Sequence, residues 1–254
     1  MRRLEGRVVM VAGGAGGIGT ASCVRLAAEG AKVCVGDIDE ASLADVVAKV
    51  TATGGEIEAT RLDLGDEASI KAAFAVARRR FGSIDLLQCN GAMTGAPMLR
   101  DTNALDVTLD TWNLTLRVDL TGYLICTKEA LPDMIAKKQG AIVYISSGAV
   151  YTPENVRVAY GTAKAGVNVL MRHVAHVWGK QGVRANAITP GPVLTPPTTA
   201  LGKDMLKELL KLGRSPRLGM PEDIAAMVAM LLSHDAAWIN GQTIAIDGGL
   251  SLRQ

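Results

Sequence analysis

Seven short runs rich in valine, isoleucine and alanine are spaced along the chain, with helix-forming stretches between them. Runs that are nearly continuous in apolar residues are typical of strands in a parallel sheet covered on both faces. Because parallel strands need crossover connections, the alternation predicts an α/β fold in which helices flank a doubly wound parallel sheet on both faces. The expected strands lie at residues 7–12, 31–37, 56–63, 84–90, 140–146, 183–189 and 241–247.

The length and apolar content fit one domain. The chain has 254 residues, of which 48% are hydrophobic, and this is ample for a single core. No repeat, low-complexity segment or linker interrupts it, so residues 1–254 are predicted to form one domain. The least regular stretch, 190–220, is rich in proline and threonine and contains an amphipathic piece at 203–212. It is interpreted as a lid over a substrate pocket or as a surface excursion.

Composition argues against several classes of partner. Lysine and arginine number 27 against 25 aspartates and glutamates, the formal net charge is +2, and only 4% of residues are aromatic. These values predict no nucleic-acid surface and no attraction to an acidic membrane. The longest apolar run, 224–232, is too short to span a bilayer, and the start of the chain is better interpreted as a first strand than as a signal peptide. A soluble cytoplasmic protein with a small-molecule substrate is expected.

Cysteines and histidines give no sign of a metal centre. No CxxC pair occurs, so buried reduced thiols are expected at Cys23, Cys34, Cys89 and Cys126. His173 and His176 share a helix face, but no third ligand lies nearby in sequence, and no metal site is predicted.

A glycine-rich segment, GGAGGIG, follows the first expected strand and precedes a helical stretch. Gly14, Gly16 and Gly19 fit the spacing G-x-G-x-x-G. Gly13, Gly17 and Gly19 fit G-x-x-x-G-x-G equally well. Glycines let the backbone approach a pyrophosphate closely, and the helix that follows offers free N–H groups and a favourable dipole. The position in the first strand–helix unit favours a Rossmann-type nucleotide site over a simple tight turn.

A carboxylate at the end of the second expected strand indicates which cofactor binds. Asp37 lies 18 residues after Gly19, where it can accept hydrogen bonds from a ribose 2′-hydroxyl and would repel a 2′-phosphate. The next residue is Ile38 rather than arginine, and the glycine loop contains no lysine or arginine. These observations predict NAD rather than NADP.

Tyr160 and Lys164 stand four residues apart at the start of a helix-like run, a spacing that puts both on one helix face. A phenol beside an ammonium is compatible with a surface coincidence and with an acid–base pair. A free tyrosine ionises near pH ~10 and is a poor base at neutral pH, but a neighbouring positive charge favours the phenolate.

Taken in order, these motifs resemble the classical short-chain dehydrogenases/reductases over essentially the whole chain. Ser147 lies 13 residues before Tyr160, the usual interval of that family, which favours it over Ser146 as the catalytic serine. Besides the glycine loop, Tyr160 and Lys164, the resemblance rests on LDL at 62–64, ISS at 145–147, NAITPGPVLT at 186–195 and GQTIAIDGG at 241–249.

The resemblance implies roles for individual residues. Tyr160 would be the general acid/base, Lys164 would favour its phenolate and hold the nicotinamide ribose, and Ser147 would hydrogen-bond the substrate oxygen. The implied cofactor contacts are Tyr160 and Lys164 together with Gly13, Gly16, Gly17, Ile18, Gly19, Asp37, Asp63, Leu64, Asn90, Gly91, Pro190, Gly191, Val193 and Thr195.

Three positions depart from the family pattern. Ala12 replaces the usual threonine before the glycine loop, and Cys89-Asn90-Gly91-Ala92 stands where Asn-Asn-Ala-Gly is usual. Asp119 replaces an asparagine whose backbone carbonyl, in many relatives, binds a water that leads to the active-site lysine. Any residue can fill that backbone role, but an aspartate adds a negative charge near Lys164. Asp119 is therefore a further catalytic candidate, expected to alter the pH optimum.

The expected substrate pocket is mostly apolar or small, and no arginine stands out to clamp a carboxylate or phosphate. A largely hydrophobic or cyclic alcohol or ketone is therefore expected, with steroids, aromatic alcohols, sugars and acyl thioesters left open. The predicted walls are Met93, Thr94, Ala149, Tyr151, Pro192, Met205 and Leu209.

Two functions remain open from the sequence. The first is an NAD-dependent oxidoreductase that interconverts a secondary alcohol and a ketone by hydride transfer. The alternative is a non-catalytic NAD-binding regulatory or scaffold protein of the same fold. Relatives are commonly homotetramers, and the apolar helix at 167–178 could supply one face of such an assembly, although a dimer also fits.

Overall fold

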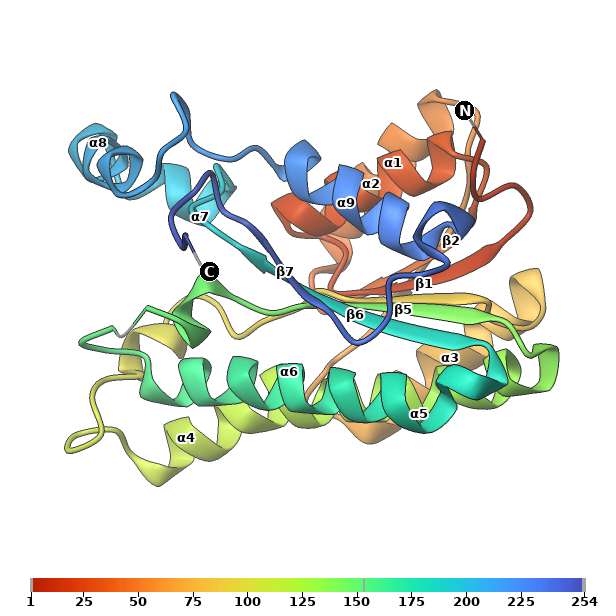
Figure 1. The fold of residues 1–254 in the computed structure, drawn as a ribbon, viewed down its shortest axis with the longest axis horizontal. Coiled ribbons are helices and arrows are strands. Elements are labelled where there is room, and N and C mark those ends of the chain that lie inside the picture. Colours follow the sequence, from red (N-terminus) through yellow and green to blue (C-terminus); the bar gives the residue numbers. More distant parts are fainter. Residues whose placement is uncertain (1, 153, 253–254) are drawn as a thin grey trace.

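The seven expected strands form one parallel sheet (Figure 1). In this computed structural model, which describes residues 2–152 and 154–252, the strand order is β3-β2-β1-β4-β5-β6-β7. The chain winds outward from β1 to β3 and then returns to β4 on the other side of β1, which confirms the doubly wound topology. The strands are Val8–Ala12 (β1), Lys32–Asp37 (β2), Glu56–Arg61 (β3), Leu86–Cys89 (β4), Gly140–Ile145 (β5), Val183–Pro190 (β6) and Thr243–Ile246 (β7).

Helices cover both faces of the sheet (Figure 1). One face carries α1 (Gly17–Ala28), α2 (Glu40–Ala52) and α9 (Pro221–Leu232). The other carries α3 (Glu67–Phe81), α4 (Leu109–Leu116), α5 (Gly122–Lys137) and α6 (Val158–Trp178). A π-helical segment, Arg117–Thr121, joins α4 to α5, and single 3-10 turns lie at Met98–Arg100, Gly148–Val150, Gly179–Gln181 and His234–Ala236.

The sheet divides the core into two apolar layers, and β1 shows how. All five of its residues are buried. Met10 and Ala12 pack with the cluster under α3, α5 and α6, whereas Val9 and Val11 pack with the cluster under α1, α2 and α9. This period-2 alternation explains why the strand is apolar at every position. The predicted buried thiols are found at all four cysteines.

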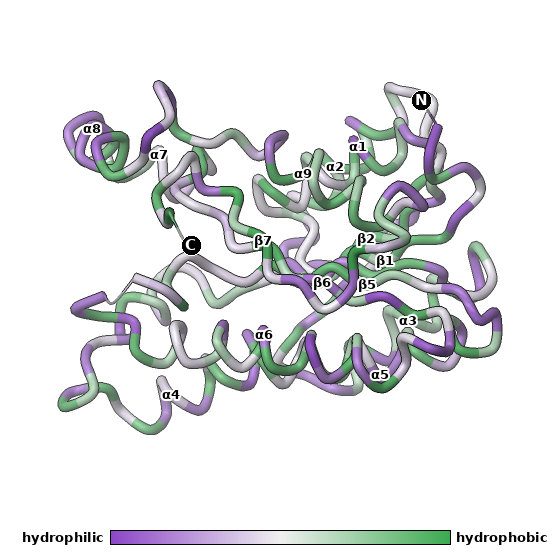
Figure 2. The backbone as a smooth tube through the Cα atoms, viewed as in Figure 1, coloured by the Kyte–Doolittle hydropathy of each residue, from purple (hydrophilic) through white to green (hydrophobic). Residues whose placement is uncertain are grey.

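The least regular stretch of the sequence contains two short helices, α7 (Pro196–Thr199) and α8 (Lys203–Leu212). Within the described residues, α8 buries none of its side chains. It projects from the body of the molecule in Figure 1, and its residues alternate between hydrophilic and hydrophobic in Figure 2. Its amphipathic pattern therefore has an apolar side that the rest of the chain leaves largely uncovered.

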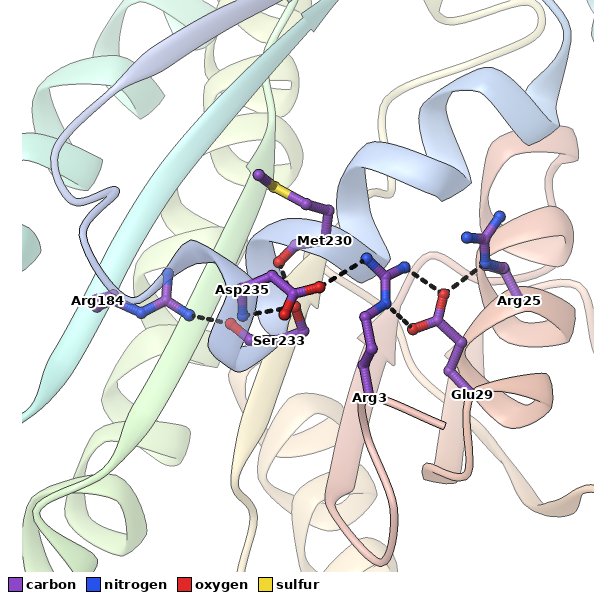
Figure 3. Close-up of polar contacts among 7 residues, drawn as sticks. All are labelled: Arg3, Arg25, Glu29, Arg184, Met230, Ser233 and Asp235. Carbon is purple, nitrogen blue, oxygen red and sulfur yellow. Dashed lines mark hydrogen bonds and ion pairs between the residues drawn. The ribbon is translucent and has the colours of Figure 1, made fainter. Parts of the chain in front are cut away.

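An ion-pair cluster ties the N-terminus to the amino edge of the sheet (Figure 3). The Arg3 guanidinium donates to both carboxylate oxygens of Glu29 and reaches Asp235, and Arg25 also donates to Glu29 at 2.6 Å. Glu29 is only 4% exposed. Burial acts to raise the pKa of the Glu29 carboxyl, but the hydrogen bonds from the two arginines outweigh it and leave that pKa below its usual value.

Candidate active site

The glycine loop connects β1 to α1 at the carboxyl edge of the sheet. Gly13 has φ +85°, and a Cβ there would lie 2.1 Å from the backbone N of Gly91. A Cβ at Gly19 would lie 2.5 Å from the Gly13 carbonyl oxygen. Both positions therefore need glycine for the loop to fold tightly against the neighbouring strand end. Gly17, the first residue of α1, faces Thr195, with 3.0 Å between its ideal Cβ and Thr195 Cγ2.

The start of α1 is suited to an anion. Within the described chain, no side chain caps its first N–H groups, because the capping position is Gly16, and a Cβ there would meet nothing within 4 Å. Uncapped N–H groups beside open space, at the positive end of a helix dipole, fit a pyrophosphate. The glycine loop and the segment containing Thr195 would hold such a group between them.

Two carboxylates stand at the neighbouring strand ends. Asp37, the last residue of β2, accepts a hydrogen bond from Ala15 N in the glycine loop at 2.9 Å. Asp63, two residues past β3, accepts from Gly65 N at 2.8 Å. Ile38 is 62% exposed beside Asp37 and carries no charge. The position and chemistry of this pair suit the adenosine end of a dinucleotide.

The segment after β4 packs directly on the glycine loop. Asn90 Nδ2 donates to the Gly13 carbonyl, and Asn90 N donates to the Ala12 carbonyl at 2.8 Å. A Cβ at Gly91 would lie 2.5 Å from Leu64 Cδ1. The exchange of glycine and alanine relative to the family pattern thus places the glycine where a Cβ would lie 3.2 Å from Gly13 Cα and would require the Leu64 side chain to move.

Lys164 lies at the centre of this edge and is 1% exposed. Its ammonium donates to the Tyr123 hydroxyl and to the Ile145 carbonyl, both at 3.2 Å. An ammonium has three N–H donors, so the hydrogen bonds found in the described chain leave one available. Lys164 Nζ is also 5.6 Å from the ring centroid of Tyr160, which puts the two predicted partners on the same side of α6.

The two rival serines have different surroundings. Ser146 is buried, and its hydroxyl donates to the Lys164 backbone carbonyl at 3.2 Å, so it fixes α6 against β5. Ser147 is half-buried at the start of the following 3-10 turn, where its hydroxyl accepts from Ala149 N. Of the two serines, Ser147 is therefore the one whose side chain is partly exposed.

Asp119 lies in the π-helical segment and is fully buried. Its Oδ1 accepts from Met93 N at 2.6 Å, while no described group donates to its Oδ2. Burial raises the pKa of the Asp119 carboxyl, and the charge of Lys164 partly opposes this. The charge of Lys164 is thus felt at Asp119, and a catalytic role of Asp119 stays a prediction.

Comparison with known proteins identifies the family. A family model described as enoyl-(acyl carrier protein) reductase matches residues 13–251. The chain is 39% identical over 252 residues to a probable short-chain type dehydrogenase/reductase of Bradyrhizobium diazoefficiens, covering 98% of this chain and 89% of the relative. The chain belongs to the classical short-chain dehydrogenases/reductases.

Two further similarities support this assignment of the short-chain dehydrogenase/reductase. It is 38% identical over 248 residues to cis-4-hydroxycyclohexanecarboxylate dehydrogenase of Sinomonas cyclohexanicum, with 96% of each chain covered. The solved structure of levodione reductase matches with a TM-score of 0.89 and 32% identity, covering 97% of this chain and 98% of that one. The protein is therefore an oxidoreductase of a family that binds a nicotinamide cofactor.

One residue of this short-chain dehydrogenase/reductase site was missed from the sequence. Tyr123 is buried, donates its hydroxyl to the Gly91 carbonyl at 2.9 Å and accepts from Lys164. Burial raises the pKa of its phenol, which therefore stays neutral. The sequence shows Tyr123 only as a lone tyrosine in the apolar run GYLIC, four residues after Asp119. Its role could not be predicted because its partner, Lys164, lies 41 residues away.

The predicted pocket residues do not all converge. Met93 and Thr94 follow the Asn90 segment, and Ala149 and Tyr151 lie at the 3-10 turn after Ser147, so these four share the carboxyl edge. Pro192 and Leu209 instead line a cavity between α8 and α9, and its lining includes neither Ser147 nor Tyr160. Met205, also on α8, is half exposed to solvent. The pocket residues on α8 therefore stay a prediction.

Two other expectations concern the chain as a whole. Among the described residues, no group of three or more histidine, cysteine, aspartate or glutamate side chains is arranged to hold a metal ion. No described helix is both long and apolar enough to cross a membrane.

Proposed function

We propose that this short-chain dehydrogenase/reductase is an NAD-dependent enzyme that interconverts a secondary alcohol and a ketone. The observation that carries the proposal is the buried ammonium of Lys164, which is fixed by two neutral oxygens next to the ring of Tyr160. A buried charge is costly unless it is paired as well as hydrogen-bonded, and no carboxylate of the described residues forms an ion pair with Lys164. Its retention there therefore argues for a role in chemistry.

The proposed acid–base chemistry uses three side chains. In oxidation, Tyr160 as phenolate takes the proton of the substrate hydroxyl, and in reduction its phenol donates a proton to the ketone oxygen. Ser147 donates a hydrogen bond to the same oxygen as charge develops on it. The ammonium of Lys164 favours the phenolate, and its remaining N–H is free for a ribose hydroxyl. A bound nicotinamide cofactor would supply the hydride acceptor or donor.

The choice of NAD over NADP rests on the adenosine end of the site. Asp37 presents a carboxylate at the end of β2, and the neighbouring exposed side chain, Ile38, is uncharged. A 2′-phosphate would bring two negative charges beside Asp37 without a cation at position 38 to balance them. NAD, with a 2′-hydroxyl, avoids this repulsion.

A hydrophobic, cyclic substrate is proposed from the surroundings of Ser147. Large apolar side chains are exposed on segments that meet at the carboxyl edge: Leu99, Tyr151 and Val156. Exposed apolar groups around a polar centre are typical of a site for an apolar ligand. The names of two similar proteins, cis-4-hydroxycyclohexanecarboxylate dehydrogenase and levodione reductase, refer to cyclic compounds, which supports this choice.

We also propose that the enzyme works in the cytoplasm as a homotetramer, with a dimer as the alternative. The four free cysteines suit a reducing compartment. The helix layer formed by α5 and α6 exposes three apolar residues: Leu124, Val169 and Val177. Such a surface is suited to contact between subunits. Sedimentation that detects only monomer at working concentration would contradict this assembly.

The test is an absorbance screen at the reduced-nicotinamide band. NAD and NADP are each offered with a panel of cyclic and open-chain secondary alcohols, and the reduced cofactors with the matching ketones. Turnover with NAD is expected, and a Tyr160→Phe variant should lose roughly 10²- to 10⁴-fold in turnover while still binding NADH. A Tyr144→Phe variant, which removes a buried hydroxyl bonded to Thr127, is the matched control and should keep its activity.

The same variants separate the enzyme from the non-catalytic alternative. A regulatory NAD-binding protein would bind NADH equally with and without the Tyr160 hydroxyl and would turn over no substrate. If the protein catalyses turnover and the Tyr160→Phe variant retains it, the acid–base assignment is wrong.

A further inference from the structure

The helix that carries Tyr160 and Lys164 begins in an unusual way. Arg157, at its capping position, has a left-handed backbone with φ +67°, and no side-chain cap from Arg157 is formed. The first N–H groups of any helix have no partner within the helix, and a buried N–H without a partner is costly. The start of α6 therefore has to be completed by another part of the chain.

Asp101 and its neighbour Thr102 complete it. Asp101 Oδ1 accepts from Ala159 N at 3.0 Å, and Asp101 Oδ2 accepts from Tyr160 N at 2.8 Å. The backbone carbonyl of Asp101 accepts from Arg157 N at 2.8 Å, and that of Thr102 accepts from Val158 N at 3.2 Å. Four consecutive N–H groups thus receive their partners from a segment 55 or more residues away in sequence.

The charge of Asp101 suits this position. The side chain is only 3% exposed, and both carboxylate oxygens are used by helix N–H groups. A negative charge at the N-terminus of a helix interacts favourably with the helix dipole, more so when it is buried. The carboxylate therefore anchors the first turn of α6 instead of forming a surface ion pair.

The anchored turn also fixes Arg157. Its guanidinium lies 4.9 Å from the ring centroid of Tyr160 and pairs with Glu154 at 2.6 Å. Because Asp101 holds the backbone N–H of both Arg157 and Tyr160, it sets the positions of the phenol and of the cation stacked on it. Asp101 belongs to the connection from Ala92 to Leu109, which begins at the predicted pocket residues Met93 and Thr94.

We infer that Asp101 is a positioning residue for Tyr160, acting through the first turn of α6, and that it couples this connection to the acid–base group. The inference rests on the proposed function. A displacement of about 1 Å in a reacting group can lower the rate by as much as 10²-fold, so the anchoring has a kinetic consequence.

The test compares Asp101→Ala and Asp101→Asn with the unmodified enzyme, using the best substrate of the screen. For Asp101→Ala we expect a roughly 10- to 100-fold lower kcat, with the Kd for NADH changed less than about threefold, since the glycine loop and Asp37 are untouched. Asp101→Asn keeps the shape and one acceptor for the two N–H groups, and should recover part of the lost kcat.

A matched control separates positioning from general loss of a helix cap. Asp66 caps α3, a helix without catalytic candidates, by accepting from Ala68 N at 2.9 Å. Asp66→Ala should lower the thermal midpoint of unfolding while leaving kcat unchanged. Both variants are compared at a temperature where each is fully folded by circular dichroism.

Each outcome is decisive. A normal kcat in folded Asp101→Ala, or an equal loss of kcat in Asp66→Ala, overturns the positioning role. If Asp101→Ala does not fold, Asp101→Asn alone decides, because a normal kcat there would contradict the inference. Failure of the proposed function is distinguishable, since it would appear as no turnover by the wild type or as unaltered turnover in Tyr160→Phe.

Discussion

The two edges of the sheet treat their buried charges differently. At the amino edge, the carboxylate of Glu29 is matched by two guanidiniums, and each of its oxygens receives hydrogen bonds. At the carboxyl edge, Lys164 is held only by neutral oxygens of Tyr123 and Ile145, and Asp119 Oδ2 has no donor among the described residues. The Glu29 cluster is electrostatically complete, whereas Lys164 and Asp119 at the carboxyl edge keep unused hydrogen-bonding capacity of the kind that a cofactor and substrate would fill.

The largest effect is expected when the buried charge at the carboxyl edge is removed. Lys164→Met replaces the ammonium with an apolar side chain of similar length. We expect kcat/KM to fall roughly 10²- to 10⁴-fold, with the free energy of unfolding changed by less than about 1 kcal/mol, because the costly buried charge is removed along with its hydrogen bonds. Steady-state kinetics and urea denaturation measure both quantities. A large loss of stability with little loss of activity would reverse the assignment of the two edges.

The complementary change removes the buried carboxylate at the amino edge. Glu29→Gln removes the carboxylate that Arg3 and Arg25 share and leaves Arg3 only its longer contact with Asp235. We expect a loss of about 3 kcal/mol of unfolding free energy with kcat unchanged. Glu5→Gln, at the exposed pair with Arg2, is the control and should cost less than about 1 kcal/mol.

The pH dependence of Glu29→Gln sharpens this test. The pKa of Glu29 is lower in the folded protein than in the unfolded chain, so its contribution is full above the unfolded value of about 4.3. The contribution is lost as pH falls through the folded value. The stability difference between Glu29→Gln and wild type should therefore shrink on acidification, and a constant difference would argue against the ionised cluster.

A smaller effect concerns cofactor choice. Asp37→Asn removes the charge that disfavours a 2′-phosphate, and the ratio of kcat/KM for NAD to that for NADP should fall roughly tenfold. An amide oxygen can still accept from Ala15 N, which the wild-type carboxylate does at 2.9 Å, so the loop itself should persist. Equal use of both cofactors by the wild type would refute the role given to Asp37.

The smallest effect is expected at Asp119. Its pKa is raised by burial, so ionisation costs stability at neutral and higher pH, and this cost disappears below the unfolded pKa of about 3.9. Asp119→Asn should therefore stabilise the protein at pH 8, and the gain should vanish on acidification. It should also move the pH–rate profile, because the negative charge near Lys164 is gone. An unchanged profile would leave Asp119 without a catalytic role.

The sequence predicted the layered architecture well because apolar runs and glycine spacing are local signals. All seven strands appear where expected, with ends shifted by one or two residues, and the family is confirmed. Strand β3 ends at Arg61 instead of residue 63, because the chain turns from Asp63, whose carbonyl accepts from Asp66 N at 3.1 Å.

The sequence did not reveal Tyr123 or Asp101, because their roles depend on partners 41 and 59 residues away. Hydrogen bonds across such distances leave no periodic pattern in one sequence. The cavity that Leu209 lines beside α9 was missed for a related reason, since an amphipathic piece shows that an apolar side exists but not what it faces. Cofactor preference, assembly and the roles of the site residues stay predictions.

The strand order also has a consequence for how the chain is made. Every neighbouring pair in the sheet is parallel, so no strand can fold back on the one before it as a hairpin, and pairing has to wait for each crossover. When Cys89 leaves the ribosome, β3, β2, β1 and β4 can already assemble. The free edge of β4 then stays open until β5, which begins at Gly140, has been synthesised. We expect the nascent chain to be most prone to aggregation at this stage, because the unpaired edge of β4 can pair with a strand of another chain.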